Sequence, residues 1–240
     1  MKRLLPILFM LGALGACSED PVAPPGGPGM LPDTLGPLTA VPLSLGDQWT
    51  YDVSWTLSVL SPDRDDFYPP RRRRADGIKE IVATENLLGE SWKVERECWR
   101  FEEGDSVQSY RRYRQDETGL YRLFVDLSAP PGALEGIQEA EEIQRLAYPL
   151  DVAVGWASLG GRRSVVQSKE MVQTATGEAE AYRIDVTSHR DGENDFIRVW
   201  FNEDGLVRRH NHHELNAIDV DSGNHVIVVT DEIETLRKGP

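Results

Sequence analysis

Trp49-Thr50-Tyr51-Asp52-Val53-Ser54-Trp55-Thr56-Leu57-Ser58-Val59 is the stretch of this sequence that decides the fold. Its odd positions are large and apolar, and its even positions are small or polar. Because side chains alternate between the two faces of an extended strand, this period of two places Trp49, Tyr51 and Trp55 on one face. Three aromatic side chains on one face need a large partner surface. The stretch therefore predicts a core strand of a sizeable β-sheet.

Similar runs follow at short intervals, separated by glycine-bearing turn signals. They predict strands over 78–83, 92–101, 107–114, 120–127, 164–174, 180–187, 196–202, 206–215 and 226–236. Between the two groups, Ala133 to Leu146 follows Pro130-Pro131-Gly132 and carries apolar residues at helical spacing, which predicts one connecting helix. The expected fold class is mainly β: a curved antiparallel sheet or half-barrel.

An internal repeat indicates that this sheet consists of two similar halves. Val41 to Trp49 and Tyr148 to Trp156 each contain Pro-Leu, with Trp seven residues after the Pro. The segments 113–122 and 200–208 each run from an aromatic strand end through an acidic turn to Gly-Leu. We expect a β domain over 41–240, with halves at about 41–130 and 148–240; chance similarity is the alternative.

The composition limits the partners. The chain has 240 residues, with 40 acidic against 26 basic side chains, and a formal net charge of −14. A nucleic-acid backbone would be repelled over most of such a surface, so no nucleic-acid partner is expected. A hydrophobic content of 40% is enough for a real core.

The first residues predict export and lipidation. A basic start and a short apolar run end in Leu14-Gly15-Ala16-Cys17, which resembles the lipobox of bacterial lipoproteins. The resemblance implies a signal peptide over 1–16 and a lipid, including palmitate, on Cys17. Because Ser18 rather than Asp follows the cysteine, it also implies an outer-membrane lipoprotein facing the periplasm or the cell surface. An ordinary secretory signal with a chance cysteine is the alternative.

Residues 17–40 are rich in Pro and Gly and lack a hydrophobic period, so we expect a tether that connects the lipidated Cys17 to the β domain.

Two motifs resemble a group of poorly characterised bacterial lipoproteins. Their β-rich domains open with Pro-Leu-x-x-Gly-x-x-Trp, as at Pro42 to Trp49, and close with an aromatic pair, an acidic turn and Gly-Leu-Val, as at Trp200 to Val207. Such proteins are similar to the β half-barrel of lipoprotein-localisation factors, whose concave face holds acyl chains. The resemblance implies a fold and transfers no catalytic residue.

One cluster has the character of a metal site. On a strand, His210, His212 and Glu214 would share a face and could bind Zn²⁺ or Cu²⁺ through imidazole and carboxylate groups. A polar strand edge that happens to contain histidines is the alternative. No cofactor is expected.

Signatures of catalysis are missing from the sequence, so we expect no enzyme and rank a hydrolase last. Trp49, Tyr51 and Trp55 could line an apolar cleft for a lipophilic ligand, or simply fill the core. The function hypothesis is a lipid-anchored, non-catalytic envelope protein that binds a lipophilic ligand or an envelope partner or has a structural role. The alternative is a metal-binding envelope protein.

Overall fold

All regular structure in the computed structural model is β, and the structure describes residues 36–158, 162–187 and 194–240. The predicted fold class is thereby confirmed. The twelve strands are β1 (Gln48–Leu60), β2 (Asp66–Leu87), β3 (Glu90–Phe101), β4 (Ser106–Asp116), β5 (Gly119–Phe124), β6 (Glu141–Ala147), β7 (Gly155–Ser158), β8 (Arg162–Thr174), β9 (Gly177–Thr187), β10 (Phe196–Asn202), β11 (Gly205–Ile218) and β12 (His225–Lys238).

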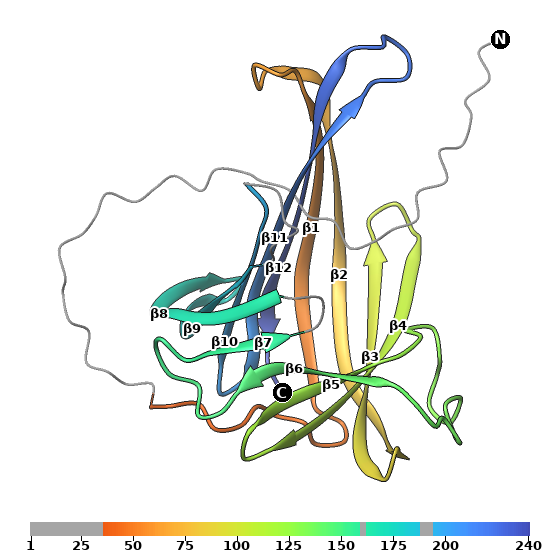
Figure 1. The fold of residues 1–240 in the computed structure, drawn as a ribbon, viewed down its shortest axis with the longest axis vertical. Coiled ribbons are helices and arrows are strands. Elements are labelled where there is room, and N and C mark those ends of the chain that lie inside the picture. The colour runs from red at the N-terminus through yellow and green to blue at the C-terminus, as the bar shows by residue number, and fades with distance from the viewer. Residues whose placement is uncertain (1–35, 159–161, 188–193) are drawn as a thin grey trace.

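These strands form one antiparallel sheet in the order β6-β5-β4-β3-β2-β1-β12-β11-β10-β9-β8-β7. Two six-stranded meanders therefore meet where β1 pairs with β12, from Thr50 opposite Lys238 to Leu60 opposite Ile227. The sheet curls until its end strands approach each other (Figure 1). There the indole of Trp156 on β7 donates a hydrogen bond to the carbonyl oxygen of Gln144 on β6, at 3.3 Å. The result is a nearly closed barrel.

The alternating stretch forms β1, as predicted. Trp49, Tyr51 and Val53 are buried, whereas Trp55 is half-buried. The ring of Trp55 lies 5.1 Å, centroid to centroid, from Trp99. The three buried side chains face the inside of the barrel, so the period of two in the sequence separates inside from outside.

The predicted helix over Ala133 to Leu146 is wrong. The segment begins with turns and ends as β6, and none of the described residues is helical. Gly136 has φ +80°, a conformation that an α-helix cannot contain. Leu134 and Ile137 pack from this loop onto a cluster of Leu87, Trp92 and Leu123, while Ile143 and Leu146 are buried from β6. The apolar residues at helical spacing thus belong to two different segments, a loop and the strand β6, and not to one helix.

The fold begins before residue 41. Leu38, inside the expected tether, is buried and exchanges backbone hydrogen bonds of 3.1 and 2.7 Å with Leu150. Cys17, the expected leader and most of the expected tether lie outside the described residues. Within the described part of the chain, no helix has the length and apolar character to cross a bilayer.

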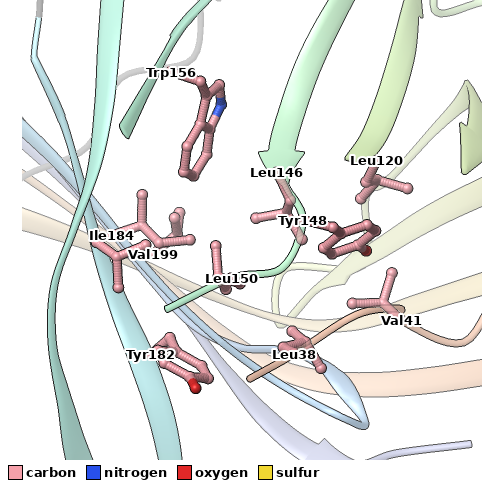
Figure 2. Packing of buried hydrophobic residues seen from close by; sticks show 11 residues of the cluster. Leu38, Val41, Leu120, Leu146, Tyr148, Leu150, Trp156, Tyr182, Ile184 and Val199 are labelled. Atoms are coloured by element: carbon pink, nitrogen blue, oxygen red, sulfur yellow. The ribbon is translucent and has the colours of Figure 1, made fainter. Parts of the chain in front are cut away.

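The barrel interior has two unlike walls. One wall is an apolar cluster of side chains that point toward one another (Figure 2): Leu38, Val41, Leu120, Leu146, Tyr148, Leu150, Trp156, Val166, Tyr182, Ile184 and Val199. The other wall carries charged side chains from β2, β3, β4, β11 and β12. A hydrophobic core therefore fills only part of the interior.

Candidate functional site: a cavity between an apolar and a charged wall

A cavity of about 110 Å³ lies where the two walls meet. Its apolar lining includes Val41, Leu43, Leu120, Val199, Phe201 and Leu206. Its charged lining consists of five cations and one carboxylate: Lys79, Arg111, Arg122, Arg145, Arg209 and Glu95. A cavity with an apolar lining on one side and a lining rich in cations on the other is suited to an amphiphilic ligand.

Strand register brings the charges together. Glu97 on β3 lies opposite Lys79 on β2, and Glu95 lies opposite Arg111 on β4. Arg111 Nη2 is 2.6 Å from Glu97 Oε2, and Lys79 Nζ is 3.5 Å from Glu97 Oε1. Residues that face each other across an antiparallel pair share a face of the sheet, so these charges all point inward.

The β11–β12 side completes the charged wall. Arg209 forms ion pairs with Glu232 and Glu234, and Lys79 forms a second ion pair with Glu234. Glu232 and Glu234 are almost fully buried. Because a buried charge is costly unless it is paired, the close approach of cations and carboxylates is what lets this wall exist inside a barrel.

The two carboxylates on β3 respond to the wall in opposite directions. Burial alone would raise the pKa of Glu97, but the attraction of Arg111, Lys79 and Arg209 outweighs it and lowers the pKa to about 2. Burial raises the pKa of Glu95, and its neighbouring cations only partly offset that effect. Glu97 is therefore a fixed negative charge, whereas Glu95 is held less firmly in its charged form.

Two cations of the lining have no carboxylate partner. Among the described residues, neither Arg122 nor Arg145 forms an ion pair, and the Nε atom of Arg122 is buried without a hydrogen-bond partner. Burial lowers the pKa of Arg122 and nearby Arg111 lowers it further, while Tyr113, Glu95 and Glu97 offset part of that effect. Arg145 also lines the cavity; burial, together with nearby Arg122 and Arg111, lowers its pKa to about 10, while Tyr113 partly offsets these effects.

The expected ligand-binding aromatics divide between wall and core. Trp49 and Tyr51 line the cavity, and each is also tied to the β10–β11 turn. Trp49 Nε1 donates to the Asp204 carbonyl oxygen at 2.6 Å, and the Tyr51 hydroxyl lies 3.1 Å from the Leu206 carbonyl oxygen. Trp55 does not line the cavity. Any role of these residues in ligand binding stays a prediction.

The expected metal ligands lie on β11, on the face opposite to Arg209, and so point away from the cavity. His210 Nε2 and His212 Nδ1 both lie 3.1 Å from Asp231 Oδ1, and His212 Nε2 lies 3.4 Å from Glu214 Oε1.

Other neighbours also occupy this cluster. Arg64 donates to both Glu214 oxygens at 2.9 Å, which lowers the pKa of Glu214 to about 2, and Phe196 stacks on His212. Within the described part of the chain, no three histidine, cysteine or acidic side chains are arranged to hold a metal ion. The geometry here is that of a hydrogen-bonded polar chain on the barrel exterior.

Sequence reasoning missed the charged lining. Its signal was present: on β3 and β4, Glu95, Glu97 and Arg111 occupy positions that alternate with residues of the outer face. Charged side chains at alternating positions are ordinarily assigned to a solvated face, so they were not recognised as an inner wall.

Comparison with known proteins gives distant structural similarity. No family model matches the chain, and no curated protein matches its sequence. A Parabacteroides distasonis protein provisionally described as a lipoprotein aligns over 82% of this chain and 97% of its own, with 12% identity and a TM-score of 0.35. A Bacteroides fragilis protein provisionally described as exported, with a YmcC-like fold, aligns over 82% and 98%, with 11% identity and a TM-score of 0.38. At these values neither protein lends this chain a function or a site.

Proposed function

We propose that this chain is a lipid-anchored, non-catalytic protein of the bacterial outer membrane that binds a lipophilic ligand inside its barrel. The lipobox-like Leu14 to Cys17 supports the anchor and the location. The observation that carries the binding role is the cavity of about 110 Å³, which has an apolar wall on one side and a charged wall on the other.

The size of the cavity limits the ligand. A cavity of about 150 Å³ is enough to hold benzene, so the space here accepts a small group or a short chain. A longer acyl chain requires side chains such as the half-buried Leu43 to move aside. Leu43 lies in the segment before β1, where a side chain can move without breaking the sheet.

Native mass spectrometry tests this proposal. Residues 36–240 contain all described strands, so the chain from residue 17 with Cys17→Ser retains the whole described fold without a lipid of its own. When it is purified from an envelope extract, we expect a mass adduct that organic solvent removes. Leu43→Trp, which adds bulk inside the cavity, should reduce the bound fraction about tenfold, because inserted bulk fills the space that the ligand needs.

Leu45→Trp is the matched control. Leu45 lies two residues away, does not line the cavity and is 66% exposed, so it should leave the adduct unchanged. A protein that carries no adduct from any extract, or an adduct equally present in both variants, would contradict binding inside the barrel.

A further inference from the structure

We propose that Arg122 and Arg145 form an anion subsite for the charged head of an amphiphile whose apolar part lies against the opposite wall of the cavity. This inference rests on the proposed function and names the chemistry of its ligand: a single-chain amphiphile with a phosphate or carboxylate head.

The other cations of the cavity lining are already neutralised by carboxylates. Lys79 is paired with Glu97 and Glu234, Arg111 with Glu95 and Glu97, and Arg209 with Glu232 and Glu234. Three cations thus share four carboxylates. These carboxylates lie on β3 and β12, and none of the four lies on β5 or β6.

The two remaining cations of the lining form no ion pair with any described residue. Arg122 lies on β5 opposite Tyr113, and Arg145 lies on β6, at the bulged part of the β5–β6 pair. Neither has a carboxylate partner among the described residues, and the buried Nε of Arg122 has no acceptor. The two arginines are close enough that, in addition to burial, Arg122 lowers the pKa of Arg145, so an anion bound beside both would be attracted by both.

The shape of the guanidinium group favours an anionic head group as ligand. Guanidinium groups bind phosphate and carboxylate through planar, paired hydrogen bonds, so arginine rather than lysine is suited to such a head. The apolar lining residues Leu120 and Val41 belong to the same cavity, so an anion at Arg122 would place an attached chain beside them.

The net charge of the chain should make this subsite prefer an anion attached to an apolar chain over a free anion. The chain carries a formal net charge of −14, so a free anion is repelled by most of the surface. An amphiphile gains from the apolar wall as well as from the arginines. We therefore expect the anion and the chain together to bind more tightly than either alone.

Isothermal titration calorimetry on the chain from residue 17 with Cys17→Ser tests the inference with four probes: octyl phosphate, 1-octanol, octyltrimethylammonium and inorganic phosphate. Octyl phosphate should bind at least about tenfold more tightly than 1-octanol, because hydrogen bonds to charged groups contribute on that scale. Arg122→Gln and Arg145→Gln should each remove most of this preference. Arg72→Gln, on exposed and unpaired Arg72 of β2, should keep it.

The outcomes separate the two proposals. Equal binding of octyl phosphate and 1-octanol would overturn the anion subsite and leave the lipophilic cavity standing. Inorganic phosphate binding as tightly as octyl phosphate would support the subsite and contradict the lipophilic cavity. No binding of any probe would overturn both. The comparison of probes uses unaltered arginines, so it decides the matter even if a variant fails to fold.

Discussion

Single residues inside the barrel carry charge where alternation in a strand ordinarily places apolar groups. Glu97 is the clearest case, since its side chain is 4% exposed and contacts both Arg111 and Lys79. Its carboxylate also accepts a hydrogen bond of 3.1 Å from the hydroxyl of Ser109. Removing one charge from such a buried group leaves its partners as buried charges without a counter-charge. The resulting loss of folding free energy exceeds the net contribution of the ion pair.

Replacing Glu97 with Gln should therefore lower the free energy of unfolding by about 3 kcal/mol at pH 7. The folded-state pKa of Glu97 is lowered from 4.5 to about 2, so its stabilisation is complete above about pH 4.5 and is lost as the pH falls toward 2. The difference in unfolding free energy between wild type and Glu97→Gln should shrink through that window. Urea unfolding at a series of pH values measures it.

Glu117→Gln serves as the control, because Glu117 is exposed in the β4–β5 turn and should cost less than about 0.5 kcal/mol. A difference between wild type and Glu97→Gln that stays constant from pH 7 to pH 3 would show that Glu97 does not act through its charge.

Residue by residue, the sequence predicts burial better than it predicts chemistry. Trp49, Tyr51 and Val53 are buried as their alternation indicates. The inward direction of Arg122 could not be predicted, because an arginine in a half-polar strand faces solvent far more often than a cavity. Only the register between neighbouring strands, which local pattern does not specify, shows which face is inside.

At the scale of elements, one buried arginine fastens the loop between β5 and β6. The side chain of Arg112 is fully buried on β4 and donates to the carbonyl oxygens of Ala129 at 2.7 Å and Pro130 at 3.0 Å. It also donates to Glu85 at 3.1 Å, and Glu85 accepts from the Gly132 amide at 2.5 Å. This network holds the loop over the cluster that contains Trp92.

Arg112→Lys should release this loop, because an ammonium group cannot reproduce three donors in a fixed plane. We expect a loss of about 2 kcal/mol in unfolding free energy and faster cleavage at Glu135 and Glu139 by a glutamate-specific protease. Mass spectrometry of the first cleavage products gives the sites.

The conservative change Arg100→Lys, on an exposed arginine of β3, controls for the general effect of losing a guanidinium. Equal cleavage rates in the two variants would mean that other contacts hold the loop.

The same loop explains why one element was mispredicted. Leu134 and Ile137 repeat at helical spacing, yet they lie half-buried on a loop that packs against the Trp92 cluster, and the residues that follow pair with β5 instead. Intrinsic spacing is a weak guide when a neighbouring strand offers a free edge for pairing. Most other strands follow the predicted runs, because they have strong alternation and glycine-bearing turns, but β7 and the first part of β2, Asp66 to Gly77, were not predicted.

At the scale of the whole molecule, the proposed anchor determines where the barrel works. If Cys17 is acylated, radioactive palmitate should label the wild type and not Cys17→Ala, and the variant should leave the membrane fraction. Autoradiography of the separated fractions measures both effects. Equal labelling of the two proteins would contradict the anchor while leaving the cavity experiments unaffected.

The domain organisation could be predicted only in part. The first six-stranded meander runs to β6 (Glu141–Ala147) and so extends past the expected first half of about 41–130, and the division into halves of about 41–130 and 148–240 stays a prediction. Their common origin stays a prediction. The inclusion of Leu38 in the core could not be foreseen, since a lone leucine among prolines and glycines gives no periodic signal.

The place of β12 has a consequence for biosynthesis. β12, the last of the described strands in chain order, lies at the centre of the sheet between β1 and β11. A ribosome delivers the amino-terminal meander first, so the edge of β1 that pairs with β12 stays unpaired until β12 has been made. The two meanders can therefore join only after β12 has been made. A chain that has to pass through a translocation pore as an unfolded thread benefits from such a delay.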